Sequence, residues 1–173
     1  MRTNRTYYFI RKQLDAMVYS FIGPFAMLYI FPQFFLRVER NLHMDFDTPL
    51  AMDYIGTALM WVGASIAIWS AALLFLKRNT ISPFSSPTKL LRSGLYKYVR
   101  HPMMWAIHIV LIGEIIVFNS PLLILWFLIW LRFAVLYIDR YEEPYLYSIF
   151  GDKYMDYCKT TPRWFPKIKK KPS

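Results

Sequence analysis

The chain has 173 residues, of which 56% are hydrophobic and 19% aromatic, and only 18% are charged. A soluble domain of this length could not bury so much apolar surface, so the composition favours insertion into a membrane. The formal net charge of +10 would suit nucleic-acid binding in a soluble protein, but the basic residues flank the apolar runs, where lipid headgroups would meet them, and we expect no nucleic-acid partner.

Apolar runs in chain order predict four transmembrane helices within a single domain, residues 1–173, since about 20 apolar residues cross a bilayer. We expect these helices at residues 16–36, 50–76, 103–118 and 121–138. The Gly23-Pro24 pair should kink the first helix. In the second helix, Gly63, Ala67 and Ala71 recur at four-residue spacing and predict a stripe for close helix packing.

The connections between the runs predict their arrangement. Asn119-Ser120-Pro121 is a turn signal, so the last two helices should form a hairpin. The loop from Lys77 to Arg100 is basic and carries no acid, which predicts that this loop and both termini face the cytoplasm in a multi-pass protein of a plasma or inner membrane, or of the endoplasmic reticulum. The tail after the last run holds five aromatic residues between Tyr145 and Tyr157; it should fold over the cytoplasmic mouth of the bundle.

This arrangement predicts that two polar stretches are neighbours at one end of the hairpin. Residues 93–102 lead into the third helix, where Pro102 suits the first turn and free N–H groups can hold an anion. The second stretch begins at Glu142 and Glu143, whose carboxylates can accept hydrogen bonds from an ammonium group or a ribose. S-adenosylmethionine has all of these parts, but NADPH or a phospholipid headgroup would also fit.

The order and spacing of the motifs are more specific. A Gly-x-Tyr-x-x-x-Arg-His-Pro loop ends at Pro102, a helical hairpin follows, and then come the Glu-Glu pair and a Phe-Gly-x-x-Tyr-x-x-Tyr segment from Phe150. Over residues 87–166, this pattern resembles the isoprenylcysteine carboxyl methyltransferase and phospholipid methyltransferase superfamily of integral membrane enzymes. The resemblance implies an all-α, polytopic membrane helical bundle with a cytoplasmic pocket for S-adenosylmethionine, and methyl transfer to a lipid-like or isoprenoid-type amphiphile.

Carried over by position, the resemblance implies a set of cofactor contacts on both stretches. They are Lys89, Leu90, Leu91, Tyr96, His101, Pro102, Met103, Met104, Glu142 and Glu143, with residues 88–91 lining the adenosine and Glu143 supporting the pocket. Two positions depart from the family. Met104 stands where a tyrosine is usual, and Ile138 stands where the prenylcysteine enzymes have an arginine for the substrate carboxylate, so the substrate need not be a prenylcysteine.

One pair of residues inside the spans suggests an acceptor site. If the hairpin turns at Asn119-Ser120, His108 and Arg132 lie at the same depth, and ionisable groups within a span usually face protein or a cavity. We therefore hypothesise that both line the acceptor pocket below the cofactor. The alternative is that Arg132 snorkels toward the headgroups and His108 is a packing residue.

Other functions stay open at this point. An NADPH-dependent membrane reductase of the sterol reductase type is one alternative function, and a non-enzymatic membrane assembly protein is another. The lone Cys158 suggests neither a disulfide nor a metal site, and we expect no metal. The membrane lipids are expected partners, whereas the substrate, the acceptor atom and the oligomeric state are not fixed by the sequence.

Overall fold

A computed structural model describes residues 23–44, 47–78 and 89–166. Residues 16–22 of the first expected span and residues 87–88 of the expected catalytic part lie outside that range. The described residues form helices joined by short connections, without a strand, which confirms the all-α prediction. In chain order these are η1 (Ala26–Ile30), α2 (Phe31–Asn41), α3 (Leu50–Arg78), η2 (Gly94–Lys97), α4 (Pro102–Phe118), α5 (Pro121–Tyr137), η3 (Ile138–Glu142), α6 (Glu143–Phe150) and α7 (Asp152–Thr160).

Two of the four expected spans are supported by length and composition. The helical segments Leu50–Leu74 and Pro121–Phe150 are long and apolar enough to cross a membrane, whereas α4 is apolar but has 17 residues. Large apolar side chains on α3, such as Trp61 and Ile68, are exposed. Such a surface would be unfavourable in water and suits contact with lipid chains.

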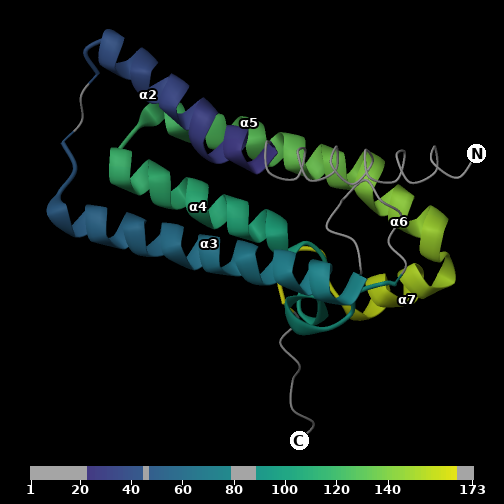
Figure 1. The fold of residues 1–173 in the computed structure, drawn as a ribbon. Helices are drawn as coiled ribbons and strands as arrows, with labels where there is room; N and C mark the ends of the chain where they lie inside the picture. The colour runs from purple at the N-terminus through teal and green to yellow at the C-terminus, as the bar shows by residue number, and fades with distance from the viewer. Residues whose placement is uncertain (1–22, 45–46, 79–88, 167–173) are drawn as a thin grey trace, which may run out of the picture.

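Helix α4 lies between α3 and α5 in Figure 1, and its contact with α3 depends on glycine. A methyl group at Gly63 would lie 2.8 Å from the carbonyl oxygen of Ala106, and one at Gly56 would lie 2.7 Å from that of Gly113. Both distances are shorter than side-chain atoms tolerate against backbone. The absence of side chains at these positions therefore lets the two antiparallel helices approach backbone to backbone.

The predicted small-residue stripe was right at Gly63 and wrong in its period. Gly56, Gly63 and Ser70 recur every seven residues and are buried, whereas Ala71 is exposed. A seven-residue repeat keeps one seam of a helix against its partner over two turns. The α3–α4 interface follows that repeat, not the four-residue spacing.

The turn between α4 and α5 confirms the predicted hairpin. Asn119 adopts the left-handed conformation, with φ of 47°, and the Ser120 Oγ accepts a hydrogen bond from the Leu123 N–H at 3.0 Å. A second cap comes from Glu39 on α2, a buried residue whose Oε1 accepts the Leu122 N–H at 2.8 Å. The carboxylate lies at the positive end of the α5 dipole, which stabilises it there. It also fixes α2 against the start of α5.

Two π-helical segments each end two residues before a proline. The first, η1, precedes Pro32, and the second, η3, precedes Pro144. Proline cannot donate a hydrogen bond within a helix, and its ring clashes with the carbonyl four residues earlier. Widening the preceding turn relieves that clash. In the described part of the first expected span the helix is therefore distorted before Pro32, while Gly23-Pro24 lies at the edge of the described residues.

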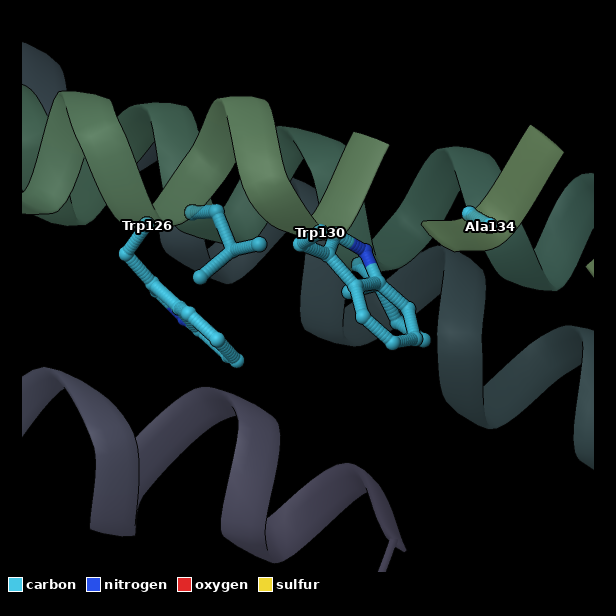
Figure 2. Packing of buried hydrophobic residues seen from close by; sticks show 5 residues of the cluster. Trp126, Trp130 and Ala134 are labelled. Atoms are coloured by element: carbon cyan, nitrogen blue, oxygen red, sulfur yellow. The ribbon is translucent and has the colours of Figure 1, made fainter. Parts of the chain in front are cut away.

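The interior between α2, α4 and α5 is filled by aromatic and aliphatic side chains. Trp126, Trp130 and Ala134 project from one side of α5 (Figure 2) and pack with Ile107 and Leu111 of α4. Trp126 also stacks on Phe31 of α2, with ring centroids 4.5 Å apart. This core fixes the rotation of α5 about its own axis, and so it decides which α5 residues face the interior.

Candidate functional site

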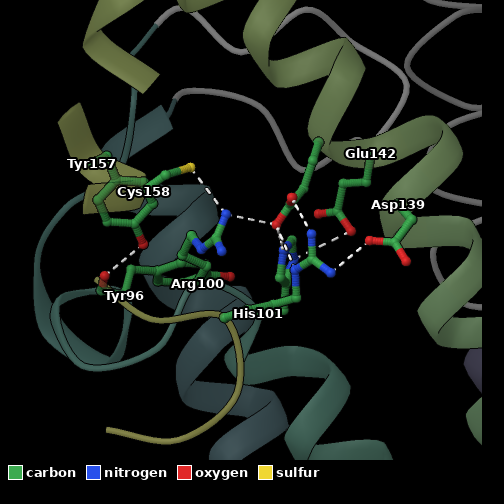
Figure 3. Close-up of polar contacts among 9 residues, drawn as sticks. Tyr96, Arg100, His101, Asp139, Glu142, Tyr157 and Cys158 are labelled. Carbon is green, nitrogen blue, oxygen red and sulfur yellow. Dashed lines mark hydrogen bonds and ion pairs between the residues drawn. The ribbon is translucent and has the colours of Figure 1, made fainter. Parts of the chain in front are cut away.

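The loop before α4 and the segment after α7 lie against each other at one end of the bundle. The N–H of Arg100 donates to the Pro162 carbonyl at 3.0 Å, and the Tyr157 hydroxyl donates to the Tyr96 carbonyl at 2.6 Å (Figure 3). We call residues 161–166 the C-terminal strap. Its position confirms that the tail folds back over this end of the bundle.

Glu143 is the centre of a charge cluster that joins three parts of the chain. Arg100 from the loop places Nη1 2.7 Å from the Glu143 Oε1, and Arg163 from the strap places Nε 3.0 Å from the same oxygen. Arg163 also reaches Asp139, at 2.5 Å. With two guanidinium groups on one carboxylate, Glu143 is already neutralised within the protein. It therefore holds the loop, the strap and the start of α6 together.

His101 bridges the two adjacent glutamates. Its Nδ1 lies 3.3 Å from the Glu142 Oε2 and its Nε2 lies 3.3 Å from the Glu143 Oε1 (Figure 3). Burial lowers the pKa of the imidazole, but the hydrogen bonds and charges of Glu142 and Glu143 outweigh burial and hold the pKa above its ordinary value. Two carboxylate partners require a donor at each ring nitrogen, which favours the imidazolium form.

The π segment explains why both glutamates face the loop. Consecutive residues on a regular α-helix point about 100° apart, whereas Glu142 and Glu143 both contact His101. They stand at the junction of η3 and α6, directly before Pro144. The widened turn that accommodates the proline thus also turns the two carboxylates toward one histidine.

The remaining residues of the predicted cofactor set divide into two groups. Pro102 is buried as the first residue of α4, Met103 is half-buried beside it, and Met104 packs against the α4–α5 core. The other group lies in the loop. Lys89 is exposed, Leu91 and Tyr96 are buried, and Leu90 packs against Leu146, Tyr154 and Tyr157.

Cys158, for which the sequence suggested neither a disulfide nor a metal site, contacts the charge cluster. Its Sγ lies 2.9 Å from the Arg100 Nη1, so it accepts a hydrogen bond from the guanidinium that also binds Glu143. Arg100 thereby links α7 to the start of α6. The sequence motifs contained Arg100 and Glu143 but not their pairing, and Cys158 directly follows the last motif. Among the described residues, no group of His, Cys, Asp and Glu side chains is arranged to hold a metal ion.

The structure does not bring His108 and Arg132 together. His108 is buried on α4, with its ring packed edge-to-face against Phe127 and Trp164 at centroid distances of 5.8 and 6.1 Å. Arg132 is exposed on α5. It lies two residues from the buried Trp130, about 200° around the helix, so it points away from the packed face.

An apolar groove opens between α5 and the helix formed by η1 and α2. It has a volume of about 330 Å³, and none of the charged residues of the His101–Glu143 cluster lines it. Its walls are Ile30, Phe31, Phe34, Phe35, Trp126 and Ile129.

A comparison with known families adds to this geometry. The profile of the phospholipid methyltransferase family matches residues 52–153, more than half of the chain. The matched range begins in α3, contains the whole α4–α5 hairpin and both glutamates, and ends in α7. No curated protein and no solved structure matches the chain significantly.

Proposed function

Because the chain belongs to the phospholipid methyltransferase family, we propose that it is an enzyme that transfers a methyl group from S-adenosylmethionine to a lipid-like or isoprenoid-type amphiphile. The observation that carries the proposal is the convergence of His101, Glu142 and Glu143 at the start of α4. The family match favours methyl transfer over the reductase and the assembly protein, which no feature of the structure supports.

The donor set around α4 fits the amino-acid end of S-adenosylmethionine. Glu142 has a side chain 33% exposed and no guanidinium partner among the described residues, so it is the carboxylate that suits the ammonium group. No side chain caps the N-terminus of α4. The Met103 amide there, beside the His101 imidazolium, suits the carboxylate. We assign the adenosine to the loop with Lys89, Leu90, Leu91 and Tyr96, as the resemblance implies.

When bound, the cofactor supplies an activated methyl group on a sulfonium, a good leaving group. The protein then needs chiefly to align the acceptor and exclude water. The strap can serve both needs. The Trp105 Nε1 donates to the Trp164 carbonyl at 2.7 Å, and Phe165 packs edge-to-face on Trp105 at 5.5 Å, so aromatic rings cover one side of α4 directly below His101.

We propose that the acceptor reaches this site from the bilayer and that the site lies at the cytoplasmic face. The basic loop between the second and third expected spans supports that orientation. The apolar groove between α2 and α5 offers a surface for a hydrocarbon chain. In this arrangement the chain of the acceptor stays in lipid while its headgroup meets the polar end of the bundle.

A transfer assay tests the proposal without knowledge of the acceptor. Membranes from cells that express the protein would be incubated with S-adenosylmethionine labelled in its methyl group, and label in the lipid extract would be counted. We expect incorporation that depends on the protein and that Glu142→Gln reduces at least about tenfold through weaker cofactor binding, since one charge-assisted hydrogen bond is worth about 1.5 to 3 kcal/mol. Asp152→Asn, at an exposed carboxylate on α7, is the matched control and should leave incorporation unchanged. Folded parent protein that incorporates no label contradicts the proposal.

A further inference from the structure

His108 is a buried histidine with one unused ring nitrogen. The residue is 6% exposed, and its Nε2 has no hydrogen-bond partner among the described residues. A neutral imidazole carries its proton on one ring nitrogen and a lone pair on the other. With the proton on Nδ1, the unpartnered Nε2 presents that lone pair.

The surroundings of this nitrogen suggest a ligand. A buried acceptor without a partner is unfavourable, so such atoms usually meet water or a bound molecule. Here the ring lies against Phe127 of α5 and Trp164 of the strap. His108 comes seven residues after His101 and so lies about 10 Å further along α4 than the predicted cofactor contacts. His108 thus lies deeper along α4 than those contacts, within the expected third span.

We propose that the His108 Nε2 is the base that takes the proton from the reacting atom of the methyl acceptor. This inference rests on the proposed function and specifies it: the acceptor carries a hydrogen on its reacting nitrogen, oxygen or sulfur. A carboxylate is already deprotonated at neutral pH, and its lone pairs would repel the lone pair of Nε2.

The step balances in atoms and charge. The acceptor loses one proton to Nε2 and gains one methyl group, while the electron pair of the broken carbon–sulfur bond stays on sulfur. The positive charge passes from the sulfonium to the His108 imidazolium. A positioned base of this kind typically contributes about 10²- to 10⁴-fold to a rate.

The first test combines a variant with product chemistry. His108→Gln keeps a hydrogen-bonding side chain of similar length but cannot take a proton, and His43→Gln, at an exposed residue after α2, is its control. We expect His108→Gln to lower label transfer at least about a hundredfold and to leave the affinity for S-adenosylhomocysteine unchanged, with no effect of His43→Gln. Mild alkali should also not release the label as methanol. Release of the label as methanol, which identifies a methyl ester, overturns the proposal, and so does full transfer by His108→Gln.

The second test does not depend on turnover, and its readout comes from the parent protein. The chain has three histidines, so ¹⁵N-histidine labelling gives three imidazoles, which single substitutions assign. We expect the parent protein at neutral pH to show His108 with a protonated Nδ1 and an unprotonated Nε2. A protonated Nε2 overturns the proposal whatever the transfer assay gives. Parent protein that has the expected tautomer but neither binds S-adenosylhomocysteine nor transfers label overturns the proposed function itself, and the base role falls with it.

Discussion

Arg163 and Glu143 form a two-point ion pair, in which Nε lies 3.0 Å from Oε1 and Nη2 lies 2.5 Å from Oε2. Twenty residues separate the pair, and α6 and α7 lie between them. Since Arg100 binds the same carboxylate at 2.7 Å, one acidic side chain closes the C-terminal helices onto the loop before α4. The two glutamates thus have different roles. Glu143 fixes the parts of the site to one another, and Glu142 is left to bind a ligand.

Removal of the strap arginine should therefore destabilise the C-terminal part of the protein. We expect Arg163→Ala to lower the free energy of unfolding by about 1.5 to 3 kcal/mol, the range for hydrogen bonds to charged groups. Arg163→Lys should recover only part of this loss, because an ammonium cannot form the two-point contact. Denaturant unfolding in detergent micelles measures both. The control is Lys159→Ala, which removes an exposed ion pair with Asp156 and should have little effect. Equal effects of Arg163→Ala and Lys159→Ala contradict the central role of Glu143.

Close packing of α3 on α4 should make Gly63 sensitive to a single methyl group. The added Cβ would meet the backbone of Ala106 at 2.8 Å, and backbone atoms cannot move aside as a side-chain end can. We expect Gly63→Ala to cost about 1 to 3 kcal/mol through overpacking, seen as a lower thermal midpoint. Gly23→Ala, where no atom of the described residues lies within 4 Å of the added carbon, is the matched control and should be neutral. Wild-type stability of Gly63→Ala would show that the helices do not approach this closely.

Substitution of Glu39 should also lower the stability of the protein, although this residue lies far from the candidate site in the sequence. Glu39→Ala leaves the Leu122 N–H without its side-chain acceptor and removes a negative charge from the N-terminus of α5. We expect a loss of about 1 to 2 kcal/mol. Arg40→Ala, at the exposed neighbouring position, should change stability little. A neutral Glu39→Ala variant would mean that Ser120 alone caps the helix.

The His101 bridge predicts a pH dependence of stability. The pKa of His101 in the folded protein is raised above its ordinary value of 6.5, so protonation favours the folded state. That stabilisation is fully present below pH 6.5 and is lost as the pH rises through the raised pKa. The thermal midpoint of the parent should fall over this window, more steeply than that of His101→Gln. His43→Gln should keep the slope of the parent, and an identical slope in His101→Gln would contradict the bridge.

Local sequence signals predicted the elements that local chemistry determines. Asn119 and Ser120 carry the turn residues of a tight hairpin, and both do what those residue types do elsewhere: one adopts the left-handed conformation and the other caps a helix. The order of the Arg-His-Pro and Glu-Glu motifs likewise predicted the meeting of His101 with Glu142 and Glu143, because the hairpin leaves both motifs at one end.

What the sequence could not give was the rotation of helices and the pairing of distant charges. Distance from the turn fixes depth but not direction, so Arg132 was placed level with His108 although the Trp126–Trp130 core turns it outward. Glu39 and Arg163 acquire their partners only from tertiary structure, across 83 and 20 residues. The proline at 144 was a visible signal: it marks the π segment that aims both glutamates at His101.

Titration calorimetry with S-adenosylhomocysteine measures cofactor binding itself, with detergent-purified parent protein beside Glu142→Gln at equal thermal stability. We expect saturable binding by the parent and binding at least about tenfold weaker in the variant, which loses a charged hydrogen-bond acceptor. Asp152→Asn should bind as the parent does. Absence of binding by the folded parent, or equal affinity of Glu142→Gln, would contradict the assignment of the cofactor to the end of the bundle where His101 meets Glu142.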